Sequence, residues 1–120
     1  MEVFNAYCDD LTFLTNDIRN NIDELKCKIG SPDTEYADKL CRTIDSLFDQ
    51  SDDMIKQVEM EARSQESKDR KIANERVKSY KDTFNQQRST YQNIIYEIQK
   101  SNLVGKSGED RGRMLDVHQK

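Results

Sequence analysis

The spacing of the apolar residues constrains the fold of this chain more than any other feature. From residue 4 to residue 29 they recur in steps of three and four, which is the pattern of one face of an α-helix. Two further stripes of the same kind cover residues 37–62 and 73–98. Because only 34% of the residues are hydrophobic and 35% are charged, a core can form only where these narrow faces meet.

The residues between the stripes predict where the helices begin and end. Gly30 is suited to close one helix, Ser31 to cap the next, and Pro32 to occupy its first position. The segment RSQESKDRK has no apolar side chain, so we place a second turn near residues 64–67. The predicted helices are at about 3–29, 33–63 and 68–100.

Long helices joined by short turns predict an all-α fold, an antiparallel up-down-up three-helix bundle formed by residues 1–100. Gly and Pro are scarce (4 and 1), and no alternating apolar run indicates a sheet. Residues 101–120 are expected to form a flexible C-terminal tail. The predicted core residues are Leu11, Ile18, Leu25, Leu40, Ile44, Leu47, Met54, Val58, Val77, Tyr80, Phe84, Tyr91 and Ile98.

The reactive side chains do not form a catalytic or metal-binding pattern. The one histidine, His118, has no nitrogen or thiol ligand three or four residues away. Adjacent carboxylates such as Asp52 and Asp53 diverge by about 100° on a helix, so they do not share a desolvated cleft. The three cysteines lack metal-type spacing and indicate a reducing compartment. We therefore expect no enzyme activity, no cofactor and no metal.

Charge is distributed unevenly along the chain. Residues 1–62 hold 15 acidic and 6 basic residues (net −9), whereas residues 63–120 hold 8 acidic and 13 basic residues (net +5). A basic cluster surrounds the second turn and comprises Lys68, Arg70, Lys71, Arg76, Lys78 and Lys81. It is explained either by a solubilising outer face or by docking to an acidic partner or lipid headgroups. The candidate docking residues are Lys68, Arg70, Lys71 and Lys78.

Two further partner classes are not expected. Aromatic residues are not interleaved with the basic ones in a nucleic-acid-binding motif. No apolar run approaches the roughly 20 residues that a membrane-spanning helix needs. The sequence as it stands therefore predicts a soluble, monomeric helical domain.

Four phrases, in order, carry a resemblance to a known family: VFNAYCDDLTFLTNDI, MIKQVEMEARS, RVKSYKDTFNQ and EDRGRMLDVHQK. Together they resemble the N-terminal region of the Vti-type vesicle-transport SNAREs, a branch of the Qb-SNAREs. The family's helix-ending phrase corresponds to Met60, Glu61, Ala62, Arg63 and Ser64. The phrase that leads into the SNARE helix corresponds to Asp110, Arg111, Arg113, Met114 and Leu115.

The resemblance implies an Habc-like bundle, followed in residues 101–120 by a linker and the start of a SNARE motif that is not included. It implies a regulatory and sorting domain of a SNARE that acts in vesicle fusion and transport between Golgi, trans-Golgi and endosomes. The implied partners are the ENTH domain of epsin-related clathrin adaptors and, through the absent motif, other SNAREs. An absent C-terminal anchor would hold the full-length protein on the cytosolic face of those membranes. The resemblance assigns no residue to the adaptor-binding face. The alternative is a stand-alone helical scaffold or adaptor without a fusion role.

Overall fold

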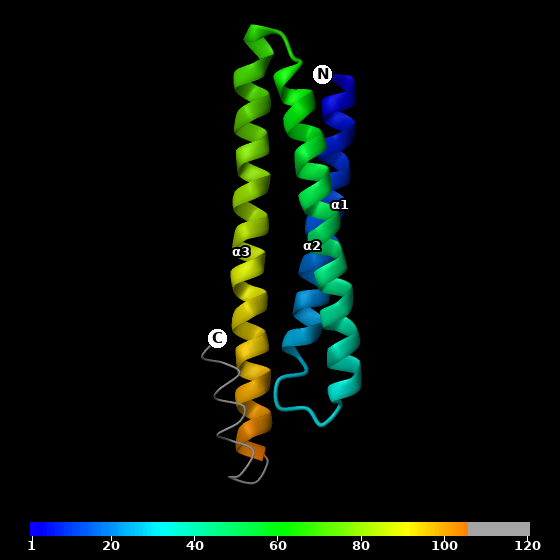
Figure 1. Cartoon of the computed structure of the whole chain (residues 1–120), viewed down its shortest axis with the longest axis vertical. Helices are drawn as coiled ribbons and strands as arrows, with labels where there is room; N and C mark the ends of the chain where they lie inside the picture. Colours follow the sequence, from blue (N-terminus) through cyan, green and yellow to red (C-terminus); the bar gives the residue numbers. More distant parts are fainter. Residues whose placement is uncertain (106–120) are drawn as a thin grey trace.

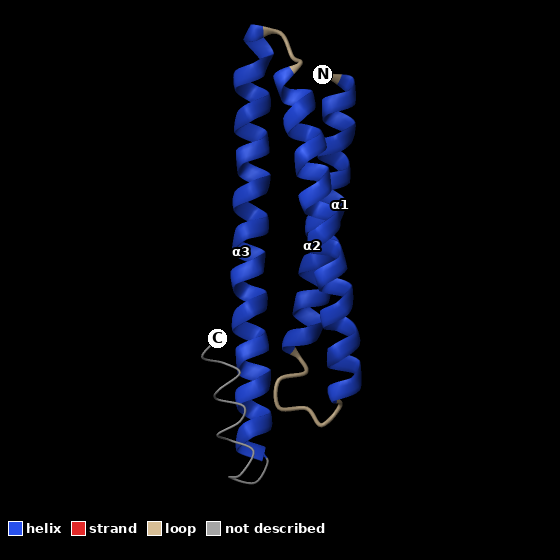
Figure 2. Cartoon of the chain, viewed as in Figure 1, coloured by secondary structure: helices blue, strands red, loops and turns tan. Residues whose placement is uncertain are grey.

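Each apolar stripe of the sequence forms one long helix (Figure 1). The structure is a computed structural model that describes residues 1–105, with side chains described through Ser101. The described residues form α1 (Glu2–Lys26), α2 (Thr34–Arg63) and α3 (Ser67–Gly105). Consecutive helices run in opposite directions, and none of the described residues forms a strand (Figure 2). The predicted all-α antiparallel three-helix bundle is therefore confirmed.

The core runs along the line where the three stripes meet. Among the predicted core residues, the structure buries Leu11, Ile18, Leu25, Leu40, Ile44, Val58, Val77, Phe84 and Tyr91. It leaves Leu47, Met54, Tyr80 and Ile98 partly buried and packed against that core. On α2 the buried positions also include Phe48, Ile55 and Ala62, which belong to the flanking row of the sequence pattern.

The burial of Phe48 and Ile55 in place of Leu47 and Met54 follows from helix geometry. The steps from Leu40 to Leu47 to Met54 are heptads, and heptad positions on a straight α-helix of 3.6 residues per turn drift by about 20° per repeat. Phe48, Ile55 and Ala62 are also seven residues apart, but this row begins one position further round the helix, so the same drift brings it toward the covered side. The side of α2 that is covered by both neighbours therefore keeps to one direction, while Leu47 and Met54 turn away from it.

α1 ends at Lys26, three residues before its predicted end. The next amides bond to carbonyls only three residues back, such as Lys28 N to Leu25 O at 2.9 Å, so the chain leaves the α-helix through a tighter turn. Ile29, the last residue of the predicted stripe, is 37% exposed. Gly30 has a φ of 80°, a left-handed conformation that costs glycine little.

The cap of α2 also differs from the prediction. α2 begins at Thr34, and Asp33 caps it, because an Asp33 side-chain oxygen accepts a hydrogen bond from Tyr36 N at 3.2 Å. Ser31 acts one step earlier, where its Oγ accepts from Asp33 N at 3.1 Å. Pro32 therefore precedes the cap and does not open the helix.

α2 ends at Arg63 and α3 begins at Ser67, with the second turn between them. α3 continues to Gly105, so residues 101–105 are helical where the sequence predicted the beginning of a linker. The rest of the predicted tail, residues 106–120, lies outside the described residues and includes the expected start of a SNARE motif.

α3 joins α1 through polar as well as apolar side chains. Tyr80 Oη donates to the backbone oxygen of Cys8 at 3.1 Å, and Gln87 Nε2 donates to that of Thr15 at 2.9 Å. Side-chain size at a contact sets the distance between helices, so these long side chains hold α3 away from its neighbours. Consistent with this, α1 and α2 lie closer to each other than either lies to α3.

α3 joins α2 in a similar way. Tyr91 Oη donates to the backbone oxygen of Cys41 at 3.2 Å, and burial raises the pKa of both side chains. The Arg88 guanidinium lies over the Phe48 ring, 4.8 Å from its centre, and reaches Asp52 Oδ1 at 2.5 Å. The contacts of α3 are therefore directional, which sets its register against α2.

Candidate partner-docking site

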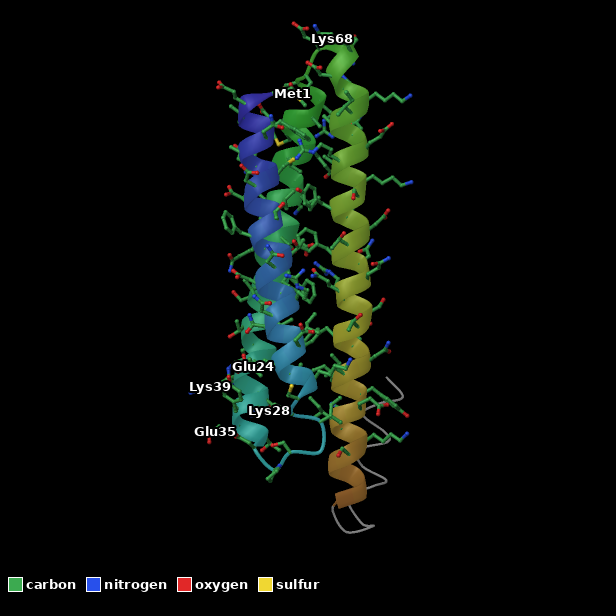
Figure 3. All side chains as sticks on the ribbon, turned by 180° about the vertical axis from the view of Figure 1, so that it is seen from behind. Met1, Glu24, Lys28, Glu35, Lys39 and Lys68 are labelled. Atoms are coloured by element: carbon green, nitrogen blue, oxygen red, sulfur yellow. The ribbon has the colours of Figure 1, made fainter. Side chains whose placement is uncertain are left out.

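The basic residues predicted as a docking site gather where α3 begins, at the end of the bundle that also holds the N-terminus. Lys68 and Met1 mark this end in Figure 3. The turn before α3 contributes to its shape, because Arg70 Nη2 donates to the backbone oxygen of Gln65 at 3.1 Å. This hydrogen bond folds the Arg70 side chain back over the turn.

Arg70, Lys71 and Lys78 lie on one face of α3, because residues seven or eight apart share a face. With Ser67, Asn74 and Glu75 they line a shallow hollow of about 470 Å³, called here the basic hollow because three of its four charged residues are basic. Lys71 and Lys78 are exposed, and neither takes part in an ion pair within residues 1–101. Their charges are therefore available to an acidic partner.

Lys68, the fourth candidate, stands apart from the basic hollow. Its ammonium lies 3.9 Å from Glu66, and both side chains are 79% exposed. An exposed pair of this kind contributes little to stability. The structure therefore brings three of the four predicted docking residues together and leaves Lys68 at the tip of the bundle.

Two basic residues of the sequence cluster pair with side chains of the other helices instead. Arg76 Nη1 donates to Asn5 Oδ1 at 2.8 Å, and its guanidinium lies 5.5 Å from the centre of the Phe4 ring. Lys81 Nζ pairs with Glu59 Oε2 at 2.7 Å. These side chains tie α3 to α1 and α2, so they do not belong to a docking surface.

Sequence analysis missed a second surface feature, a groove of about 690 Å³ between α1 and α2. It is called here the acidic groove, and its lining includes Tyr7, Asp10, Phe13, Leu14, Asp53 and Met54. The groove was missed because it depends on how two helices pack. The signal in the sequence was Phe13, a large apolar residue that lies off the first stripe.

The described residues offer little reactive chemistry. Within residues 1–101, no group of His, Cys, Asp and Glu side chains is placed to hold a metal ion. The cysteines are free thiols, and burial raises the pKa of Cys8 and Cys41, which suppresses the nucleophilic thiolate at neutral pH. None of the helices that the structure describes is long and apolar enough to cross a membrane.

The fold and its surfaces define the class of this chain as a long antiparallel three-helix-bundle domain with charged outer faces. Within that class the comparison with protein families is specific. The family "Vesicle transport v-SNARE protein N-terminus" matches residues 1–101, so the chain belongs to this family. The match covers α1, α2 and most of α3 and confirms the resemblance found in the sequence, consistent with a Vti-type v-SNARE N-terminal domain.

Membership indicates a SNARE role in vesicle transport, association with vesicle membranes and SNARE partners. The family is one of non-enzymatic trafficking proteins. No curated protein and no solved structure matches the chain.

Proposed function

We propose that this chain is the regulatory and sorting domain of a Vti-type SNARE that acts between Golgi, trans-Golgi and endosomes. The observation that carries the proposal is the family match over residues 1–101, which coincides with a folded bundle. The domain works by binding proteins and not by catalysis. In the full-length SNARE, on the cytosolic face of those membranes, partner SNAREs pair with the SNARE motif and the bundle is free for other partners.

The partner proposed for the bundle is the ENTH domain of an epsin-related clathrin adaptor, which would pack the SNARE into vesicles as cargo. The basic hollow is the proposed contact surface, because Lys71 and Lys78 form no ion pair within residues 1–101 and present their positive charge on one helix face. Complementary charge accelerates association and selects partners, so an acidic patch on the adaptor would recognise this face.

The test is a titration of isotope-labelled 1–120 with such an ENTH domain. We expect local shifts on α3 and an affinity that falls with added salt. Lys71→Glu and Lys78→Glu should each weaken binding about tenfold, since each replaces an attractive contact by a repulsive one. Lys39→Glu is the matched control, because exposed Lys39 lies toward the opposite end of the bundle (Figure 3).

The possible results of the titration distinguish the proposed contact surface, the proposed partner and the alternative function. Binding that is equally sensitive to Lys39→Glu would remove the basic hollow from the proposal, and shifts confined to another face would do the same while keeping the adaptor as partner. No binding at high micromolar concentration would remove the sorting role. The alternative, a helical scaffold or adaptor without a fusion role, would then gain support.

A further inference from the structure

The acidic groove has an apolar floor and an exposed aromatic rim. Tyr7 and Leu14 of α1 and Met54 of α2 are partly buried and packed against the core, so their outer surfaces form the floor. Phe13 lines the same groove and is 69% exposed. A single exposed apolar residue is ordinary on a protein surface, but here the ring adjoins a hollow that is already apolar. The result is one continuous apolar surface.

The charge around this surface is mainly negative. Residues 1–18 of the chain contain no Lys, Arg or His, and residues 43–62 of α2 contain one basic residue, Lys56, against four Asp and two Glu. Asp10 and Asp53 line the groove, and neither forms an ion pair with any residue whose side chain the structure describes. Asp52, the neighbour of Asp53, forms an ion pair with Arg88 of α3. Arg88 therefore neutralises Asp52 and not the carboxylates that line the groove.

We propose that the acidic groove binds one amphipathic helix of a partner protein, with apolar residues on its inner face and Lys or Arg beside them. A helix laid into a groove buries its apolar residues at i, i+3 or i+4, and i+7. The lining positions 7–14 and 50–57 each extend over about two helical turns, roughly 10 Å, which matches that spacing. Phe13 is the apolar anchor, and the carboxylates of Asp10 and Asp53 pair with the basic residues of the partner.

The acidic groove is a different site from the basic hollow, and no residue lines both. The acidic groove binds a basic partner, whereas the basic hollow binds an acidic one. The inference therefore does not depend on the proposed adaptor binding, and either proposal can fail without the other.

The test uses isotope-labelled 1–120 and two synthetic helical peptides of about 18 residues, or five turns. One peptide carries Leu on its apolar face and Lys beside it, and the other replaces each Lys by Glu. We expect the Lys peptide to shift the signals of Tyr7, Phe13 and Met54, with an affinity that falls as salt is added. The Glu peptide should leave these signals unchanged.

Variants then distinguish a built site from general attraction to an acidic protein. Phe13→Ala and the double variant Asp10→Asn with Asp53→Asn should each lower the affinity for the Lys peptide about tenfold. The matched controls are Ile72→Ala, which truncates a 53% exposed apolar residue of α3, and the double variant Glu35→Gln with Asp38→Asn. The controls should change the affinity less than twofold. An equal loss in the controls would overturn the proposal, since peptide binding would then be non-specific.

The proposal would also be overturned if either of two other occupants filled the groove. If 1–120 self-associates and Phe13→Ala abolishes the association, the groove holds a second copy of this chain. If Met114→Asp or Leu115→Asp shifts the signals of Phe13 and Met54 without any peptide, the groove holds the chain's own C-terminal segment. Because Phe13 is exposed, Phe13→Ala should melt like the parent, so a loss of binding would not reflect unfolding.

Discussion

Ile44→Ala is the most direct test of how α2 packs. Ile44 is 0% exposed in the core, and the substitution removes the three outer carbons of its side chain. At about 0.8 kcal/mol for each buried carbon, the lost burial costs about 2.4 kcal/mol of unfolding free energy. The cavity that remains raises the cost, and core Ile→Ala changes cost about 2–5 kcal/mol in total. We expect about 3 kcal/mol for Ile44→Ala.

The assay is urea unfolding followed by far-ultraviolet circular dichroism, with two comparison variants. Leu47→Ala removes the same number of carbons one turn further along α2, where the side chain is only partly buried, so about 1–2 kcal/mol is expected. Ile29→Ala truncates a residue that is 37% exposed and outside α1. Its effect should be the smallest of the three, about 1 kcal/mol. An unchanged dependence on urea would show that all variants unfold from the same compact state.

The ranking of the three losses of unfolding free energy tests how α1 and α2 pack. If Leu47→Ala lowered the unfolding free energy as much as Ile44→Ala, the row of Leu40, Leu47 and Met54 would be fully covered. The explanation of α2 packing by the drift of this row would then be refuted. If Ile29→Ala were as costly as either, the first stripe would extend past Lys26, against the observed end of α1.

Three further predictions concern polar groups. Gln87 Oε1 is buried without a hydrogen-bond partner within residues 1–101, while Gln87 Nε2 donates to Thr15 O. Gln87→Met removes both the unsatisfied acceptor and this hydrogen bond, so it should change the stability by less than about 1 kcal/mol, whereas Gln87→Ala also leaves a cavity and should lower it further, both measured by urea unfolding. Asp33→Ala removes the cap of α2 and should cost about 1 kcal/mol in the same assay, while Asp33→Asn should stay near the parent. Burial raises the pKa of the Tyr91 phenol, so its stabilisation is complete below the unfolded-state pKa of about 10 and falls as the pH rises above it, because the unfolded chain ionises first. The urea midpoint of the parent should therefore fall more between about pH 9 and pH 11 than that of Tyr91→Phe; equal slopes would contradict this.

The helices were predictable because their signals are local. Steps of three and four residues mark a helix wherever they occur, and the apolar-free segment before Lys71 placed the second turn near its observed position. The predictions that were wrong concern the ends of the helices. Ile29 continued the apolar spacing although the chain leaves α1 after Lys26, and Asp33 caps α2 in place of Ser31. Sequence alone does not decide between neighbouring capping residues, because both satisfy the same rule.

The candidate sites were only partly predictable. The basic residues near the second turn are visible in the sequence, but their roles are not. Within residues 1–101, Lys71 and Lys78 of the basic hollow form no ion pair, whereas Lys81 pairs with Glu59 of α2. Which lysine finds a partner depends on the rotation of α3 against α2. The acidic groove likewise exists only because Phe13 and Met54 come from two helices that lie side by side.

The sequence by itself determined that the chain folds into long amphipathic helices, that the helices reverse at two places, and which side of each helix is apolar. These properties depend on residues within one or two turns of each other. The tertiary structure decided which residues of the two apolar rows of α2 are covered, since burial depends on the directions of both neighbouring helices. It also decided which charges remain free and where a groove opens between helices. A stripe belongs to one helix, but a docking surface belongs to a pair of helices, and only their packing brings its residues together.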